Sequence, residues 1–389
     1  MRIAYVAPYQ GPSLCNARPI VGNLSLAGST KIELIAKLLG EKQHEVEVIS
    51  QGEVVDRRFR WYPPLVEQTP FDSAVPIFYA SALPIRFVNG LWSSYRTLEL
   101  FKARHRKAPY DLVIVYNLKQ PQVACAYHAI DCLHLPVVLE YEDDAFVDVR
   151  GKTELPRLGV SRGHNAVGLL SKFSGCMAAS PYLLSRIPSE IPRLLLRGVI
   201  GEDLMRVSEQ LKHEKRNWVL FSGTHYRSKG IKQLIVAWQR LRMAGWELHI
   251  TGYGELTEAL QKMAAGDSSI VFHGLVSRNE LVKLMCSAKV CINPHDMSET
   301  PGNVFAFKII EYLAAGAHVL STPMGELESD IERGVTYMRD NDPATIAATL
   351  RDVLSEWGTR DAQALQIGGL YGPHAIANRI DEFIQLVRR

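Results

Sequence analysis

The chain has 389 residues, 47% of them hydrophobic and 22% charged, and its formal net charge is +3 at pH 7. This is the composition of a folded globular protein long enough for two domains, and it gives no reason to expect a nucleic-acid partner. The six cysteines include no Cys-x2-Cys pair, which disfavours a zinc site or a disulfide framework. Because no apolar run approaches the ~18 residues of a membrane span and residues 1–8 do not form a signal peptide, we expect a cytoplasmic protein.

The first elements of the chain predict a parallel α/β sheet. Residues 3–8 form an apolar strand, residues 30–41 an amphipathic helix with Ser29 as its N-cap, and residues 45–50 a second strand. This order is typical of a doubly wound domain. The loop before the helix contains Gly28-Ser29, which either lets the backbone approach a ligand or simply turns the chain.

Residues 51–107 have the least regular pattern. Residues 57–107 contain nine basic and three acidic residues, arginines alternate with aromatic side chains from Arg57 onward, and a helix ends near Lys107. Cationic and aromatic side chains favour the surface of an anionic membrane, at about 1 kcal/mol for each cation. The alternative is an irregular loop packed on its own domain.

An acidic run follows the strand predicted over residues 137–141. The sequence there reads Glu140-Tyr141-Glu142-Asp143-Asp144. Ligands of open α/β sheets bind at the carboxyl ends of the strands, and repulsion among four carboxylates can raise the pKa of one of them and leave a usable acid or base. A hydrated acidic turn is the alternative reading, and we expect no metal site here.

The strand pattern restarts after a linker near residues 198–203. Strand 218–222 leads into Gly223-Thr224-His225-Tyr226-Arg227-Ser228-Lys229-Gly230, which precedes an amphipathic helix. Strand 247–251 leads into Gly252-Tyr253-Gly254, and strand 270–272 into His273-Gly274-Leu275. Glycine-rich turns with cations suit an anionic ligand, although a charged loop without a ligand has the same composition. Ser277 and Glu280 then predict a capping box at the start of the next helix.

The strongest local signal lies in residues 293–316. We expect a helix from Asn303, a good N-cap residue, to Gly316, a good C-cap residue. Free amides at such a helix start attract anions. Lys308 and Glu311 share one helical face, where the first suits a phosphate and the second a ribose diol. The alternative is a surface helix with a chance Lys–Glu pair.

This segment resembles the donor-site helix of glycosyltransferase family 4. That helix usually reads Glu-x7-Glu followed by Ala-x-Ala-x-Gly-x-Pro-Val. Here Glu311 stands at the second Glu and Ala314-Ala315-Gly316 follows, whereas Asn303 replaces the first Glu and His318 the proline.

Other segments are similar to the same family. Its Gly-Arg-x4-Lys-Gly element, whose Arg and Lys hold the donor diphosphate, is matched by Lys229-Gly230. Thr224 stands at the usual arginine position, so Arg227 would have to reach the diphosphate from another place in the loop. Glu140 and Asp143 occupy the places of a His-x-x-His that often lies beside the reacting sugar.

The resemblance implies a GT-B fold, which is α/β with two Rossmann-like doubly wound domains and an interdomain cleft. The expected domains are an acceptor-side domain over residues 1–200 and a nucleotide-sugar-binding domain over residues 201–370. A C-terminal helix over residues 371–389 is expected to cross back to the first domain.

The implied function is transfer of a sugar from a nucleotide diphosphate sugar, without a further cofactor or metal, to a saccharide or lipid-linked acceptor. The resemblance is to a family that retains the anomeric configuration. The residues assigned to donor binding are Gly28, Ser29, Gly223, Thr224, Arg227, Lys229, Gly252, Gly274, Leu275, Asn303, Val304, Phe305, Ala306, Phe307 and Glu311. The residues assigned to catalysis are Glu140, Asp143 and Lys308.

Two other functions remain open at this point. A nucleotide-sugar epimerase shares the fold and needs no acceptor, and the replaced Glu and Arg also allow a non-catalytic protein that binds nucleotide sugars. Peripheral contact with an anionic membrane through residues 57–107 is a further expectation, which would place the protein on the inner face of the membrane.

Overall fold

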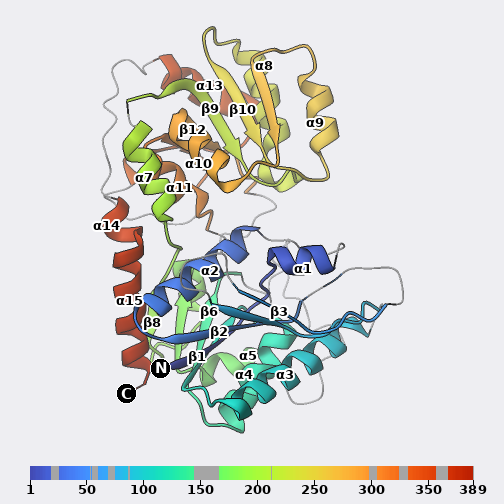
Figure 1. Cartoon of the computed structure of the whole chain (residues 1–389). Helices are drawn as coiled ribbons and strands as arrows, with labels where there is room; N and C mark the ends of the chain where they lie inside the picture. The colour runs from blue at the N-terminus through green and yellow to red at the C-terminus, as the bar shows by residue number, and fades with distance from the viewer. Residues whose placement is uncertain are drawn as a thin grey trace. The chain divides into compact units, whose positions relative to one another are not determined.

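The computed structural model describes residues 1–18, 26–52, 54, 60–68, 75–85, 88–143, 166–211, 213–297, 305–323, 332–355 and 367–388 (Figure 1). The chain forms two compact units. The first comprises Met1–Val199 and His374–Arg389, and the second comprises Ile200–Pro373.

The first unit is built on an eight-stranded sheet in the order β3-β4-β2-β1-β5-β6-β7-β8. The strands pair in parallel except for β3 and β4, which are antiparallel. The strands are β1 (Arg2–Val6), β2 (Glu45–Ser50), β3 (Leu65–Gln68), β4 (Pro76–Tyr79), β5 (Leu112–Tyr116), β6 (Val137–Tyr141), β7 (Gly175–Ala178) and β8 (Arg193–Leu195). The helices are α1 (Pro12–Ala17), α2 (Leu26–Glu41), α3 (Asn89–Lys107), α4 (Gln120–Asp131), α5 (Ala166–Leu169), the 3₁₀ helix η1 (Leu170–Lys172), α6 (Pro181–Ser185) and α15 (Pro373–Val387).

Helices cover both faces of this sheet, which explains why its central strands are almost wholly buried. All five residues of β1 are buried, as expected for a parallel strand with helices on both sides. One core contains Ile32 and Ile35 of α2 together with Ile380 and Phe383 of α15. The C-terminal helix therefore packs in the core of the first unit (Figure 1).

Two expectations for the first unit are wrong. The first long helix begins at Leu26 rather than at residue 30, so Ser29 lies inside α2 and does not cap it. Its hydroxyl instead accepts a hydrogen bond from the Gln10 amide at 3.2 Å. Residues 51–107 are also more regular than expected, since β3 and β4 form an antiparallel pair. Strands of four residues give only a weak alternation pattern in a sequence, so they are easily missed.

The second unit is built on a six-stranded, all-parallel sheet in the order β11-β10-β9-β12-β13-β14. The strands are β9 (Arg216–Ser222), β10 (Glu247–Thr251), β11 (Ile270–Gly274), β12 (Ala288–Asn293), β13 (His318–Ser321) and β14 (Val335–Tyr337). The helices are α7 (Glu202–Leu211), the 3₁₀ helix η2 (Arg227–Lys229), α8 (Ile231–Leu241), α9 (Thr257–Ala264), α10 (Arg278–Ser287), α11 (Lys308–Ala314), α13 (Pro343–Ser355) and α14 (Ile367–Tyr371).

Local sequence signals set several boundaries in this unit. The predicted capping box is confirmed, because the Ser277 side chain bonds the Glu280 amide and the Glu280 carboxylate bonds back to Ser277. The helix expected from Asn303 is wrong at its start: α11 begins at Lys308, and Phe307 is its N-cap residue. Its predicted end is confirmed, since Gly316 follows the helix with a φ of +72°.

Candidate functional site

The candidate donor site lies where β9, β10 and β12 end. The loop that begins at Gly223 follows β9, and the turn that begins at Gly252 follows β10. Gly252 has a φ of +124°, and a Cβ atom on it would overlap the carbonyl oxygen of Gly223. Only glycine fits there, because a side chain would be strained and would separate the two loops. The predicted glycines Gly223 and Gly252 therefore pack the loops closely.

Two lysines from different elements lie beside these loops. Lys308, the first residue of α11, directs Nζ to within 3.4 Å of the Ser222 carbonyl oxygen and 4.6 Å of the centre of the Phe221 ring. Lys229 at the end of η2 lies near it, and its Nζ is 3.2 Å from Nε2 of His295. Burial, and then the charge of Lys229, lower the pKa of Lys308 to about 7.

This arrangement favours an anion. Two neighbouring ammonium groups that have lost part of their hydration repel each other, and a bound anion would relieve both costs. Among the described residues, no carboxylate lies within salt-bridge distance of Lys308. The predicted pair Lys229 and Lys308 is thus brought together by the fold in a form suited to phosphate.

Glu311 lies one turn along α11 and is held by an arginine that the sequence analysis missed. Arg278 donates from Nη1 to Glu311 at 2.8 Å and from Nε to Asp203 at 2.9 Å. One carboxylate oxygen of Glu311 is thereby fixed by a charged hydrogen bond. No signal in the sequence links Arg278 to Glu311, because the two residues belong to different helices.

The other predicted donor residues are spread along the same edge. Gly223, Thr224 and Arg227 are exposed, and Leu275, which follows Gly274, is 69% exposed. Tyr253, which the sequence analysis did not single out, is 62% exposed beside Gly252. Phe305, Ala306 and Phe307 are half-buried before α11, and Asn303 and Val304 lie outside the described residues.

In the first unit, Glu140 is enclosed by protein. It is the fourth residue of β6, has an exposed fraction of 0%, accepts a hydrogen bond from the Tyr5 hydroxyl and lies 3.6 Å from Nζ of Lys31. Lys31 also forms an ion pair with Glu142. The arrangement makes Glu140 a buried partner of Lys31 and Tyr5.

The expected rise of one carboxylate pKa is found at Glu142, which has a pKa of about 7. Its main cause is burial, and the charge of Glu140 adds to it, whereas Lys31 opposes it. Asp143 is exposed, and its backbone amide donates to the side-chain oxygen of Asn117 at 3.1 Å. Gly28 and Ser29 lie in the first turns of α2, and Asp144 lies outside the described residues.

The raised pKa of Glu142 predicts a pH-dependent stability. Because the folded state holds this proton more tightly than the unfolded state, the stabilisation is complete below the ordinary pKa of 4.5 and is lost as the pH rises through about 7. We expect Glu142→Gln to make the first unit's free energy of unfolding less dependent on pH between 5 and 8. Denaturant titrations at several pH values measure this, and an unchanged pH dependence in the variant would contradict it.

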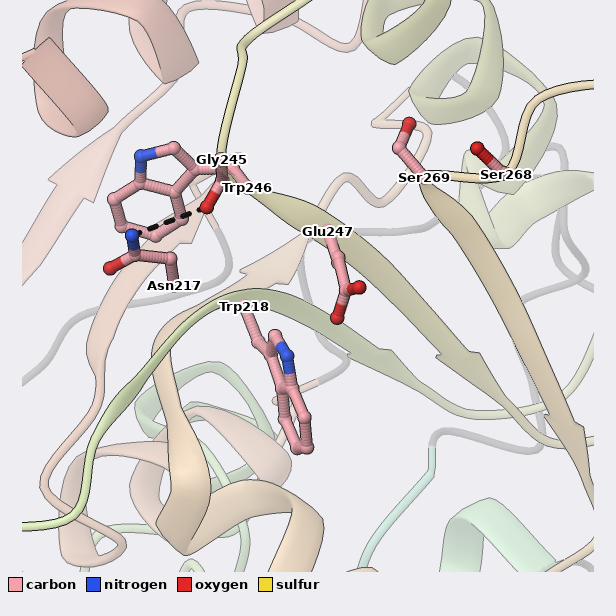
Figure 2. A pocket seen from close by; sticks show the side chains of 7 residues that line it. All are labelled: Asn217, Trp218, Gly245, Trp246, Glu247, Ser268 and Ser269. Atoms are coloured by element: carbon pink, nitrogen blue, oxygen red, sulfur yellow. Dashed lines mark hydrogen bonds between the residues drawn. The ribbon is translucent and has the colours of Figure 1, made fainter.

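A shallow pocket of about 400 Å³ lies at the opposite edge of the second sheet. It is lined by residues at the amino ends of the strands, including Asn217 and Trp218 of β9 and Glu247 of β10 (Figure 2). The Asn217 amide donates to the carbonyl oxygen of Gly245 at 3.2 Å. None of the predicted donor residues lines this pocket.

In the described part of the chain, no three His, Cys, Asp or Glu side chains are grouped as a metal ion would need. No described helix is long and apolar enough to cross a membrane.

The second unit matches a family model. The model describes group 1 glycosyl transferases and matches residues 216–356, which include β9 to β14 and every candidate donor residue of the second unit. The second unit is that of a group 1 glycosyltransferase. The chain is therefore an enzyme of the glycosyltransferase class.

Solved structures resemble the whole chain. Sucrose-phosphate synthase from Thermosynechococcus elongatus is 17% identical with a TM-score of 0.70, and the match covers 99% of this glycosyltransferase and 98% of that chain. HepE from Anabaena in complex with UDP is 14% identical with a TM-score of 0.62, and the match covers 99% of this chain and 100% of that chain. The catalytic domain of starch synthase IV from Arabidopsis thaliana, bound to ADP and acarbose, is 11% identical with a TM-score of 0.64, covering 100% of both chains.

At these identities the similarity shows the fold. The glycosyltransferase has the GT-B fold with two Rossmann-like domains, as the sequence predicted. No curated protein matches the chain.

Proposed function

We propose that this glycosyltransferase moves a sugar from a nucleoside diphosphate sugar to a saccharide or lipid-linked acceptor, with retention of the anomeric configuration, in the synthesis of a polysaccharide. The observation that carries the proposal is that Lys229 and Lys308 both lie at the carboxyl edge of the second sheet, close enough for the charge of Lys229 to lower the pKa of Lys308. A nucleoside diphosphate leaves as an anion, and cations placed beside it stabilise the transition state.

The other proposed contacts with the donor come from residues at the same carboxyl edge of the second sheet. Lys229 and Lys308 hold the diphosphate, and Arg227 adds a third cation from the same loop. Glu311 accepts hydrogen bonds from the ribose through the oxygen that Arg278 leaves available. The turn at Gly274 and Leu275 and the exposed Tyr253 ring receive the nucleobase. Support comes from their common location and from the UDP and ADP held by proteins of similar fold.

Retention is proposed because the resemblance is to a retaining family and because the first unit offers no ready base at Glu140. An inverting enzyme needs a base behind the sugar to deprotonate the acceptor. Glu140 is buried against Tyr5 and Lys31, which leaves Asp143 as the exposed carboxylate of the described acidic run. In a retaining reaction the departing phosphate itself takes the acceptor proton on the face that it leaves.

The test uses the full-length protein with a panel of α-linked nucleotide sugars. We expect nucleotide release that depends on an acceptor, and an α linkage in the product by proton NMR. Conversion of the sugar without an acceptor would instead identify an epimerase, and nucleotide binding without turnover would identify a non-catalytic protein. A β linkage would overturn retention and make Asp143 the first candidate for the base.

We also propose that residues 57–107 contact an anionic membrane on its cytoplasmic side, where a lipid-linked acceptor would lie. Support comes from exposed Trp61 beside Arg60, and from exposed Leu91 and Tyr95 at the start of α3. Aromatic side chains suit the membrane interface, and cations suit anionic headgroups.

Vesicle sedimentation tests this contact. We expect binding to anionic vesicles that decreases as salt rises, because salt screens exposed charges. Neutralising Arg57, Arg58 and Arg60 together should weaken this binding several-fold and leave donor hydrolysis unchanged. Equal binding to neutral and anionic vesicles would contradict the proposal.

A further inference from the structure

His295 lies in the loop after β12 and is almost fully buried, with 3% of its surface exposed. Its Nε2 atom is 3.2 Å from the ammonium nitrogen of Lys229. An ammonium group has donors only, so Nε2 must accept the hydrogen bond and the ring proton must reside on Nδ1. The histidine is therefore a neutral acceptor that contacts one of the two lysines of the candidate site.

Burial keeps the ring in that state. Loss of hydration, together with the charges of Lys229 and Lys308, lowers the pKa of His295 to about 3. A protonated ring would have no acceptor to offer Lys229. Near neutral pH the acceptor is consequently always present.

The backbone around His295 is fixed on both sides. Its carbonyl oxygen accepts a hydrogen bond from the Thr322 hydroxyl at 2.9 Å, and the next amide, that of Asp296, donates to the Ser228 carbonyl oxygen at 2.8 Å. Gly230 has a φ of +68°, and a Cβ atom there would overlap the Pro294 carbonyl oxygen. The loop that carries His295 thus packs directly on the loop that carries Lys229.

Lys229 needs such a partner because of its neighbour. A lysine side chain loses rotamer entropy when it is held in one position. Repulsion from Lys308 adds to this cost and favours conformers in which the two ammonium groups separate. An acceptor at Nε2 opposes both effects before any ligand is bound.

We propose that His295 is a positioning residue that holds the Lys229 ammonium beside Lys308, so that the two cations stand ready for the diphosphate of the donor. This inference rests on the proposed function, because it assigns a ligand to the two lysines. His295 itself need not touch the substrate. It acts through Lys229, and its contribution disappears when Lys229 is removed.

The experiment measures binding of inorganic pyrophosphate to the full-length protein by titration calorimetry. We expect His295→Phe, which keeps a ring but has no acceptor, to weaken binding about tenfold. His295→Gln should stay within about threefold of the wild type, because its amide oxygen can reach the place of Nε2. His295→Asn serves as the polar control, since its shorter amide reaches only the place of Nδ1, and it should behave like His295→Phe.

A double-mutant comparison separates positioning from a general effect on the fold. Lys229→Ala should weaken pyrophosphate binding, and adding His295→Phe to it should change the affinity less than twofold. If His295→Phe and His295→Asn bind as tightly as the wild type, or if His295→Phe costs the same tenfold without Lys229, the inference is wrong and the proposed function stands. If the wild type does not bind pyrophosphate, both are wrong. Thermal unfolding of each variant verifies that it is folded, and the Gln and Asn pair decides the question if the Phe variant is not.

Discussion

Replacing Lys308 by alanine is expected to lower kcat/KM roughly 10- to 100-fold and to leave the fold intact. A charge-assisted contact contributes about 1.5–3 kcal/mol, and each 1.36 kcal/mol changes a rate tenfold. Lys308 lies beside Lys229, and burial and that charge lower its pKa to about 7. Removing one of two repelling cations should therefore cost little stability. Steady-state assays of nucleotide release and thermal unfolding measure the two effects.

Lys262→Ala is the matched control for this prediction. Lys262 is an exposed lysine of α9 in the same unit, outside the loops of the candidate site. It should retain wild-type kinetics. Equal kcat/KM in Lys308→Ala and Lys262→Ala would remove the main basis of the proposed mechanism.

Glu311→Ala should give a different kinetic result from Lys308→Ala. A contact with the ribose is made equally in the ground state and the transition state, so its loss should raise KM for the donor and change kcat little. The departing phosphate gains charge in the transition state, so the loss of Lys308 should lower kcat as well. A fall in kcat for Glu311→Ala as large as that for Lys308→Ala would contradict this division of roles.

Replacing Lys31 by methionine should destabilise the first unit by about 3–5 kcal/mol, the cost of leaving a buried charge without its partner. Lys31 lies 3.6 Å from Glu140 and also pairs with Glu142, while Glu140 is fully buried. The loss should shrink at low pH, because a protonated Glu140 needs no cation. Hydrogen exchange at the amides of β1 and β6 measures the free energy of opening.

Lys37→Met is a control on the same helix. Lys37 and Glu41 form a partly exposed pair at 3.5 Å, and such surface pairs contribute about 0–1 kcal/mol. A loss of stability in Lys31→Met no larger than in Lys37→Met would show that the buried cluster around Glu140 does not need the lysine.

Much of the fold could be predicted from local patterns. β2, β6 and β10 have the limits that hydrophobic spacing predicts, because the residues of a buried strand show its pattern over several neighbouring positions. The short strands β3, β4 and β14 are not predicted, since three or four residues are too few to show an alternation of apolar and polar side chains. The start of α11 was misplaced because Asn303 has a good capping side chain, and capping propensity alone does not decide where a helix begins.

The candidate site also has features that the sequence predicts and features that it does not. That Lys229 and Lys308 follow strand ends, with glycine in the turns around them, could be predicted from the sequence, because charge, glycine and strand positions are local properties. The partners of the site residues could be known only once the chain was folded. His295 lies 66 residues from Lys229, and Glu311 lies 33 residues from Arg278. Strand order in the sheet brings such residues together, and no spacing within one element records which side chain will be met from another.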